Sequence, residues 1–187
     1  MLRHLPNALC VFRMLLVVPI AVLLAREEYG ITMWVFGLAA LTDGLDGFLA
    51  KRFGWTSELG KILDPLADKL LLVSVFITLA AVGLVPLWLA GAAVARDLTI
   101  TGGAIAYKCF FGDLNGRPTP VSKLNTLCQI LYLLSVVGAA AADRAGGPVV
   151  TALGAIVFAT TVVSGLDYVI TYTRKAIAVS RERRQRA

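Results

Sequence analysis

Aspartates at helical spacing are the part of this sequence best suited to chemistry. They fall in two pairs, Asp43 with Asp46 and Asp64 with Asp68, within a mostly apolar chain. Residues three or four apart share one face of a helix, so each pair presents two carboxylates together. Ionised carboxylates are costly in lipid and are functional there by default. Oxygen-only ligands favour a hard divalent ion, so the pairs predict a Mg²⁺ or Mn²⁺ site, and four carboxylates are enough ligands for two ions.

Composition places these aspartates in a membrane protein. Of the 187 residues 58% are hydrophobic, and the mean hydropathy is +0.77. This is more apolar surface than one soluble domain of this size buries. Six windows approach the roughly 20 apolar residues of a spanning helix. They are Asn7 to Ala25, Ile31 to Ala50, Ile62 to Val82, Pro86 to Tyr107, Val121 to Ala142 and Pro148 to Tyr172.

The predicted fold is therefore an all-α membrane protein with six transmembrane helices. It forms a single domain over residues 1–187, with a basic tail at about 174–187. A cleaved signal peptide is the disfavoured alternative, because Arg13 interrupts the first window and no A-x-A site follows it. The absence of an Arg- and Ser-rich amphipathic presequence favours a plasma or bacterial inner membrane over a mitochondrial one.

Lys and Arg residues set the expected orientation. With Met1 in the cytoplasm, most cations of the tails and loops are cytoplasmic, and only Arg26 and Arg144 lie outside. The positive-inside rule then places both termini and the aspartates on the cytoplasmic side. The basic tail is interpreted as a solvated, orienting segment, with contact to anionic lipid headgroups as the alternative. This pattern gives little support to nucleic-acid binding.

A short polar link, Lys51 to Gly60, joins the two aspartate pairs. The second and third helices are therefore expected to be antiparallel neighbours whose carboxylates meet. We expect Asp64 to cap the third helix, with Pro65 in its first turn. Hard cations held by carboxylates usually bridge to substrate phosphates, which predicts phosphoryl transfer at a lipid-facing site.

Cations and glycines around the aspartates suit a diphosphate ligand. Lys51 and Arg52 supply positive charge, although both also fit a purely orienting role. Gly47 and Gly60 allow a ligand to approach the helix backbones closely. Gly44 fits that role and helix packing equally well.

The string Asp46-Gly47-Phe48-Leu49-Ala50-Lys51, with Gly60, Asp64 and Asp68 following at fixed spacing, resembles the signature of the CDP-alcohol phosphatidyltransferases. Asp43 corresponds to its leading aspartate. The family usually has Arg after the alanine, where this chain has Lys51 followed by Arg52, so either cation is a candidate for the diphosphate contact. The resemblance implies a six-helix, usually homodimeric membrane fold that displaces CMP from a CDP-linked lipid.

The resemblance also implies roles for individual residues. The metal ions would be bound by Asp43, Asp46, Asp64 and Asp68. Asp68 would in addition be the catalytic base that takes the proton of the acceptor hydroxyl. The CDP-lipid would contact Asp43, Asp46, Gly47, Ala50, Lys51, Arg52 and Gly60.

Motifs outside the signature bear on the acceptor. Leu5-Pro6-Asn7 with Arg13 and Pro19 resembles the start of the family's phosphatidylglycerophosphate and cardiolipin synthase branches. Ala95-Arg96-Asp97, Pro120-x-Ser122-Lys123-x-Asn125-Thr126-x2-Gln129 and Thr160-Thr161-x2-Ser164 look more like the eukaryotic type of cardiolipin synthase.

Buried or juxtamembrane cations are the candidates for holding an anionic acceptor. Arg96 lies too deep for easy snorkelling, and with Arg117 and Lys123 it is expected to bind the acceptor's phosphate. The structural alternative is an ion pair of Arg96 with Asp97 or Asp167. Lys69 is either a site cation or the partner of a carboxylate.

Three functions remain at this point. The favoured one, by resemblance, is cardiolipin synthesis from CDP-diacylglycerol and phosphatidylglycerol, and the second is phosphatidylglycerophosphate synthesis with glycerol 3-phosphate as the acceptor. The third is a cation transporter, which would need carboxylates spread through the membrane or on broken helices at its midplane. The clustering of the four aspartates at one face disfavours transport.

Overall fold

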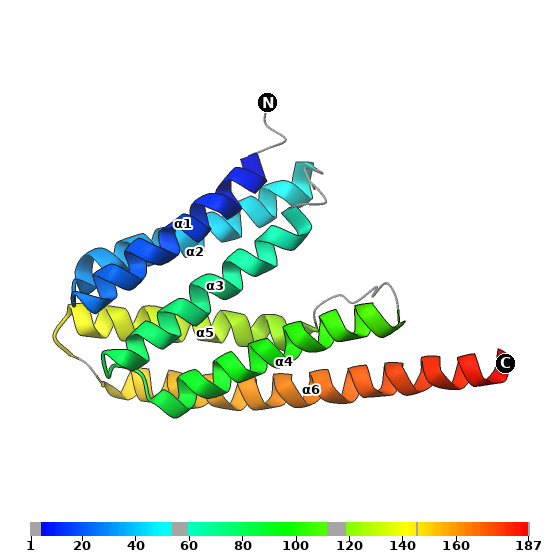
Figure 1. Cartoon of the computed structure of the whole chain (residues 1–187). Coiled ribbons are helices and arrows are strands. Elements are labelled where there is room, and N and C mark those ends of the chain that lie inside the picture. Colours follow the sequence, from blue (N-terminus) through cyan, green and yellow to red (C-terminus); the bar gives the residue numbers. More distant parts are fainter. Residues whose placement is uncertain (1–4, 54–59, 112–118, 145, 187) are drawn as a thin grey trace.

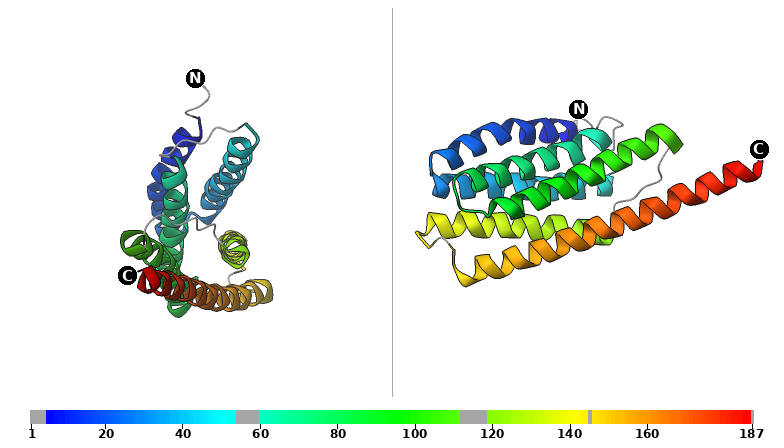
Figure 2. Two further views of the ribbon diagram at one scale, coloured as in Figure 1. Left: turned by 90° about the vertical axis from the view of Figure 1, so that its right-hand side faces the viewer. Right: turned by 60° about the horizontal axis from the view of Figure 1, so that its bottom comes forward.

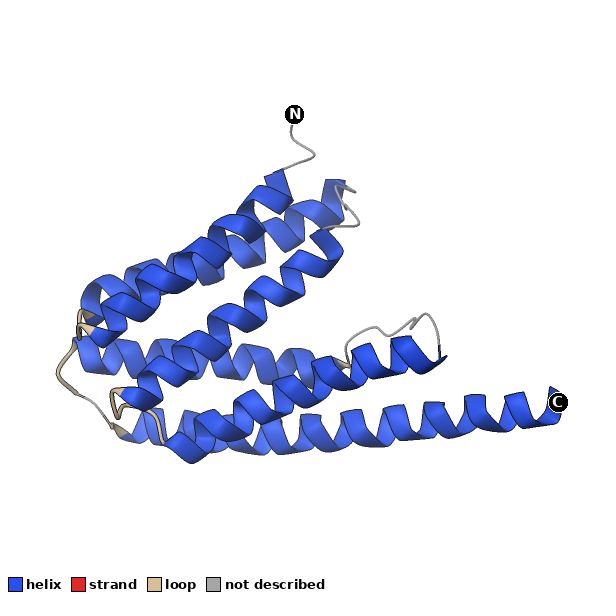
Figure 3. Ribbon diagram, in the orientation of Figure 1, coloured by secondary structure: helices blue, strands red, loops and turns tan. Residues whose placement is uncertain are grey.

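A computed structural model of the chain describes the backbone of residues 5–53, 60–111, 119–144 and 146–186, and side chains at 10–42, 67–103, 119–144, 146–171 and 173. Throughout these ranges the ordered elements are helices, without a strand (Figure 3). The helices are α1 Leu5–Ala25, α2 Tyr29–Phe53, α3 Gly60–Ala81, α4 Leu87–Phe111, α5 Pro120–Ala141 and α6 Pro148–Arg186. The predicted all-α class and the order of six helices are confirmed.

Two boundaries differ from the expectation. α3 already includes Gly60, so Asp64 and Pro65 lie beyond its first residues, and the prediction of Asp64 as the capping residue was wrong. A local capping signal is weak compared with tertiary packing, and α3 packs against α1. α6 continues helically through the basic tail to Arg186 rather than ending near Tyr172.

The six helices form a ring of neighbours. α1 packs against α2 and α3, α3 against α4, α4 against α6, α6 against α5, and α5 against α2. A further contact between α3 and α5 crosses the ring, and the end-on view in Figure 2 shows this arrangement. Successive helices run in alternating directions, so that α2 ends and α3, α5 begin at the same end of the bundle (Figure 1). We call this end, which carries residues 43–53 and 60–68, the aspartate end.

Apolar residues fill the centre of the ring. Phe76 of α3 stacks with Tyr132 of α5 at a centroid distance of 6.3 Å. Leu24, Leu79 and Leu133 are among the fully buried side chains around them. Close packing of such side chains makes the bundle a rigid frame for the few polar residues that it encloses.

The outer surface is also apolar. Large hydrophobic side chains are exposed on all six helices, including Leu15, Trp34, Leu87 and Leu166. A monomeric soluble protein rarely exposes this much apolar surface, whereas lipid is a compatible environment for it.

Two helical segments in the described part of the chain are long and apolar enough to cross a membrane, judged by length and composition. They are Pro120–Ala141 and Pro148–Thr171. The described apolar parts of α1 and α2, Cys10–Ala25 and Tyr29–Thr42, are shorter. Six helices are therefore confirmed, but six membrane-spanning helices are not.

Gly154 lets α6 approach α5 closely. A Cβ atom at this position would lie 3.2 Å from Cε2 of Tyr132, a ring held by its stacking on Phe76. Overpacking of this kind costs about 1–3 kcal/mol, against a gain of about 1 kcal/mol in helix propensity. We expect Gly154→Ala to have a lower melting temperature than Gly91→Ala, whose Cβ would meet open space. Equal melting temperatures for the two purified variants would contradict this packing argument.

Candidate active site

Asp68 forms an ion pair with Arg13 in the interior of the bundle. The Arg13 guanidinium donates a hydrogen bond from Nη1 to Oδ1 of Asp68, joining α1 to α3. The Arg13 side chain is only 2% exposed, whereas that of Asp68 is 34% exposed. A buried charge needs a partner with good geometry, and Arg13 provides one for Asp68. Asp68 is therefore held from the α1 side and remains accessible from another.

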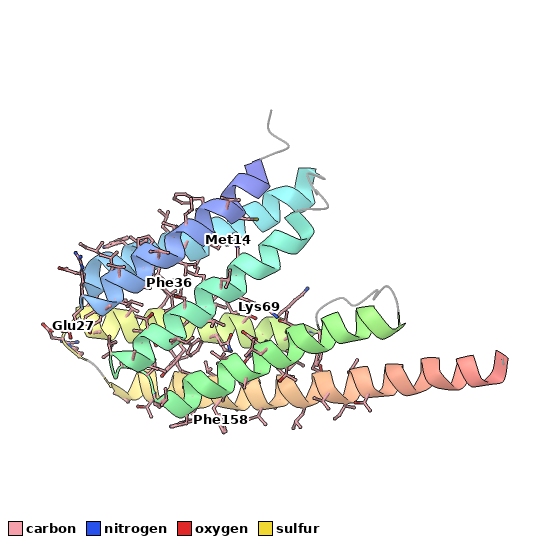
Figure 4. The ribbon with its side chains drawn as sticks, viewed as in Figure 1. Met14, Glu27, Phe36, Lys69 and Phe158 are labelled. Atoms are coloured by element: carbon pink, nitrogen blue, oxygen red, sulfur yellow. The ribbon has the colours of Figure 1, made fainter. Side chains whose placement is uncertain are left out.

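Asp68 and Arg13 line a pocket between four helices. The other walls come from Phe36, Ala39 and Ala40 of α2, Leu71 and Leu72 of α3, and Thr126 and Ile130 of α5. The empty volume is about 330 Å³, including open space at its mouth. Figure 4 marks Phe36 on α2, beside α1 and α3. A carboxylate and a guanidinium thus face a space whose remaining walls are almost entirely apolar.

The described parts of α2 and α3 are not in direct contact, although the sequence predicted that these helices are neighbours. α1 packs against both α2 and α3, whereas α2 and α3 make no close contact with each other within the described residues. Their described parts instead face the same pocket, α2 through Phe36, Ala39 and Ala40 and α3 through Asp68. The prediction that they are direct neighbours was therefore wrong for these parts, because α1 occupies the position beside both.

Most of the signature lies outside the described side chains. The residues concerned are Asp43, Asp46, Gly47, Ala50, Lys51, Arg52, Gly60 and Asp64. Their backbone is helical, with the first six near the end of α2 and the last two near the start of α3. This arrangement brings both parts of the signature to the aspartate end of the bundle (Figure 1).

The metal prediction rests on this donor set. No group of three or more His, Cys, Asp or Glu side chains occurs within the described part of the chain. Asp68 is the one predicted ligand whose side chain is described, and it is a hard oxygen donor partly exposed to a pocket. These properties fit a hard divalent cation. The participation of Asp43, Asp46 and Asp64 remains a prediction.

A second polar cluster surrounds Arg96 of α4. Its guanidinium donates a hydrogen bond to Asp97 at 2.5 Å and another to the Ser122 hydroxyl of α5 at 2.7 Å. A third group, the Ser164 hydroxyl of α6, accepts a bond from Nε at 3.2 Å and a shorter one from Nη2. Arg96 and Asp97 are each 7% exposed. The Arg96–Asp97 pair, the structural alternative to acceptor binding, is therefore present, and the guanidinium also joins three helices.

The residues at the start of α5 explain why Ser122 lies at this cluster. Thr119 caps α5, because its side chain accepts a hydrogen bond of 3.2 Å from the backbone nitrogen of Ser122. Pro120 occupies the first turn, where a missing N–H costs nothing. A fixed helix start sets the register of every polar residue further along α5.

Lys69 follows Asp68 directly but faces another neighbour. Its ammonium group donates a hydrogen bond to the Thr101 hydroxyl of α4, and that hydroxyl donates in turn to the Asp97 carbonyl at 2.8 Å. Figure 4 labels Lys69 on the part of α3 that passes close to α4. The sequence allowed Lys69 to be a site cation or a carboxylate partner, and its recorded hydrogen bond goes to a neutral hydroxyl. Two adjacent residues of α3 therefore belong to different sites: Asp68 lines the pocket, and Lys69 lies next to the Arg96 cluster.

The remaining acceptor candidates are less informative. Lys123 is exposed, one residue beyond Ser122 at the start of α5. Arg117 lies outside the described residues.

Asp167 of α6 has a buried Oδ2 with no hydrogen-bond partner within the described part of the chain, one turn beyond Ser164. The Arg96–Asp167 pair considered from sequence is therefore not the one that forms.

Arg13 is the site residue that the sequence analysis missed. From the sequence alone, Arg13 is an interruption of an apolar window and part of an N-terminal motif. A signal was present, because Arg13 is the single charged residue between Leu5 and Ala25. A charged residue within an apolar helix normally faces a buried partner, which here is Asp68.

The sequence model of the CDP-alcohol phosphatidyltransferases matches residues 3–179. The chain belongs to the CDP-alcohol phosphatidyltransferase family. The match includes both signature segments, the Arg13–Asp68 pair and the Arg96 cluster. Because the family is membrane-embedded, it agrees with the apolar character of α5 and α6.

Curated relatives fall into two branches of this family. Human cardiolipin synthase (CMP-forming) is 29% identical over 95% of this chain and 64% of its own length. The probable phosphatidylglycerophosphate synthase of Mycobacterium tuberculosis is 30% identical over 90% of this chain and 81% of its own length. A chloroplastic CDP-diacylglycerol–glycerol-3-phosphate 3-phosphatidyltransferase of Oryza sativa subsp. japonica is 31% identical over 90% of this chain. The chain spans less than two thirds of the human and the rice protein, 64% and 57% respectively.

Proposed function

We propose that this protein transfers the phosphatidyl group of CDP-diacylglycerol to phosphatidylglycerol, giving cardiolipin and CMP. The observation that carries the proposal is the carboxylate of Asp68 in the wall of an otherwise apolar pocket, in a chain of this family. Apolar walls suit a lipid substrate, and a carboxylate suits proton removal at its reacting end. The similarity to human cardiolipin synthase (CMP-forming) supports the choice of acceptor.

The reaction has one bond formed and one bond broken. A hydroxyl oxygen of the acceptor attacks the phosphorus that carries the diacylglycerol, and the bond from that phosphorus to the CMP oxygen breaks. CMP leaves with the electron pair of that bond. Asp68 takes the hydroxyl proton, and Arg13 holds the carboxylate in place for this step.

The four aspartates would hold two divalent cations, either Mg²⁺ or Mn²⁺. The residues are Asp43, Asp46, Asp64 and Asp68. Bound cations of this kind neutralise phosphate charge and orient the reacting groups. The cytidine diphosphate would lie against Gly47, Ala50 and Gly60, with Lys51 or Arg52 at its charges.

Arg96 is proposed to bind the acceptor's phosphate, with Arg117 and Lys123 as further cations. The guanidinium is already fixed by Asp97, Ser122 and Ser164, which orients it for an anion. Lys69, which is half-buried, adds a second cation next to this cluster. Asp97 offsets only one of these two positive charges, so an anionic group would be favoured here.

Glycerol 3-phosphate is the second candidate acceptor, which would make the product phosphatidylglycerophosphate. The M. tuberculosis relative, named as a probable phosphatidylglycerophosphate synthase, favours this candidate, because the match covers 81% of that protein. Both reactions would use the same donor and the same aspartates. They differ in whether the acceptor enters from lipid or from water.

In the cell, we propose a plasma or bacterial inner membrane location with the aspartate end facing the cytoplasm. The positive-inside distribution of Lys and Arg supports this orientation. We also propose a homodimer, as is usual in the family, with the exposed apolar helix faces available for packing.

The deciding experiment supplies the purified protein with Mg²⁺ or Mn²⁺, radiolabelled CDP-diacylglycerol and one acceptor at a time. Cardiolipin formed only with phosphatidylglycerol supports the first proposal. Phosphatidylglycerophosphate formed only with glycerol 3-phosphate replaces it by the second. Cation uptake into vesicles without either product would instead support a transporter.

Substitution of Arg96 tests the acceptor assignment. Arg96→Lys keeps the charge but loses the planar fork that reaches Asp97, Ser122 and Ser164 at once. We expect the acceptor KM to rise about tenfold or more, equivalent to one charge-assisted hydrogen bond, and the KM for CDP-diacylglycerol to change less. An effect confined to the KM for CDP-diacylglycerol would contradict the assignment. Arg26→Met, which removes an exposed cation beyond the end of α1 and outside the proposed site, is the comparison variant.

A further inference from the structure

Two buried amide side chains on α5 have polar atoms without hydrogen-bond partners. Asn125 and Gln129 are 0% and 1% exposed. The Asn125 Oδ1 accepts hydrogen bonds from the Thr160 and Thr161 hydroxyls of α6, at 2.9 and 3.0 Å. Within the described part of the chain, the Asn125 Nδ2 and both polar atoms of the Gln129 side chain have no hydrogen-bond partner.

Such groups are costly in this position. α5 and α6 are the two described helices that qualify as membrane spans, so bulk water does not reach their interface. Buried polar groups are normally satisfied by protein, ordered water or a ligand, and each exception needs an explanation. Three orphan atoms within one helical turn indicate that something polar belongs between α5 and α6.

The amides continue the Arg96 cluster along α5. Ser122, Asn125 and Gln129 are spaced by three and four residues, so they form one stripe of the helix. Ser122 accepts a bond from Arg96 at 2.7 Å, and the stripe from Ser122 to Gln129 covers about 10 Å at 1.5 Å per residue. On α6, Ser164 and Thr161 follow the same path. The cationic group therefore lies at one end of the stripe and the orphan amides at the other.

We propose that Asn125 and Gln129 bind the hydroxyl groups of the acceptor's glycerol unit, while Arg96 binds its phosphate. This inference rests on the proposed function, and it applies to a glycerol phosphate whether lipid-borne or free. The stripe is long enough to hold a phosphate at Arg96 and a three-carbon polyol beyond it. The site would favour an acceptor that carries a hydroxyl on the carbon next to the reacting one.

The chemistry of the stripe favours a neutral polyol over other occupants. An amide both donates and accepts hydrogen bonds, and so does a hydroxyl, so each orphan atom has a matching group on glycerol. The stripe beyond Arg96 carries no charge, which disfavours a second phosphate. An acyl chain would leave all three orphan atoms unsatisfied.

The test uses acceptors that differ by one hydroxyl. Purified wild type, Gln129→Met and Asn125→Leu are compared with phosphatidylglycerol and phosphatidyl-1,3-propanediol, and separately with glycerol 3-phosphate and 3-hydroxypropyl phosphate. Each analogue keeps the terminal nucleophile and lacks only the middle hydroxyl. Ser135→Ala is the matched control, because Ser135 also lies on α5 but donates to the Tyr132 carbonyl of its own helix.

For the wild type and the control, we expect the acceptor KM to be about tenfold or more lower for the glycerol compound than for its analogue. In Gln129→Met this preference should fall below about twofold, with the KM for CDP-diacylglycerol unchanged. Asn125→Leu should reduce it as well. The lipid pair and the soluble pair of acceptors distinguish which source of glycerol phosphate is used.

Two results would overturn the inference. One is a wild type that shows no preference between the members of either pair. The other is a preference that persists in Gln129→Met, with only a rise in melting temperature, since this would mean that Gln129 is a structural group. A wild type that transfers no phosphatidyl group to any of the four acceptors would instead refute the proposed function.

Discussion

Asp68→Asn is expected to lower the rate of CMP release by about 1000-fold or more, which corresponds to roughly 4 kcal/mol of transition-state stabilisation. Asparagine cannot take the proton of the acceptor hydroxyl, and it is a weaker ligand for a hard cation than a carboxylate. Its amide oxygen can still accept the hydrogen bond from Arg13, so the bundle should stay folded. The measurement is CMP release in detergent or vesicles, together with a melting curve by circular dichroism.

Two further variants make this result specific. Asp64→Asn should also abolish transfer, because the signature assigns Asp64 to the cation site. Asp143→Asn removes an exposed carboxylate in the turn between α5 and α6, at the opposite end of the bundle, and should have normal activity. CMP release close to the wild-type rate in either Asp64→Asn or Asp68→Asn would remove the basis for the proposed aspartate site.

Arg13→Leu is expected to destabilise the protein by about 2–3 kcal/mol. Removing one partner of a buried ion pair leaves the other charge uncompensated, and the cost is reduced here because Asp68 is 34% exposed. For a protein of this size the change corresponds to a fall in melting temperature of roughly 4–12 °C. Thermal unfolding of the purified protein, monitored by circular dichroism, measures it.

Two control variants for Arg13→Leu distinguish the loss of the ion pair from a general effect of removing a positive charge. Arg144→Leu removes an exposed Arg and should have a melting temperature within about 2 °C of the wild type. The double variant Arg13→Leu with Asp68→Leu should recover most of the lost stability, because two apolar groups can replace a buried pair. Similar melting temperatures for Arg13→Leu and Arg144→Leu would show that the Arg13–Asp68 pair does not stabilise the fold.

The helical architecture was largely predictable. Apolar windows of membrane length located all six helices to within a few residues, apart from the end of α6. The prediction succeeded because a backbone in an apolar environment must satisfy its hydrogen bonds within a helix, and this leaves a strong pattern in the sequence. The local signal of Asp64 and Pro65 placed the start of α3 too late, whereas the apolar window beginning at Ile62 came close to the observed start at Gly60.

The candidate site was predictable only in part. The signature spacing pointed to Asp68 because residues at fixed spacing on one helix share a face whatever surrounds them. The choice between Asp97 and Asp167 as the partner of Arg96 could not be made in the same way. It depends on the rotation of α4 and α6 about their axes, which is set by the whole bundle.

The apolar helical character of the chain, the family signature and the clustering of the aspartates toward one end were all predictable from the amino-acid sequence. These properties follow from composition and from local spacing along single helices. The tertiary structure decided which polar residues meet: Arg13 with Asp68, Lys69 with Thr101, and Asn125 with Thr160 and Thr161. Those contacts join helices that are far apart in the chain, and they depend on a ring order and on helix rotations that arise only when all six helices pack together.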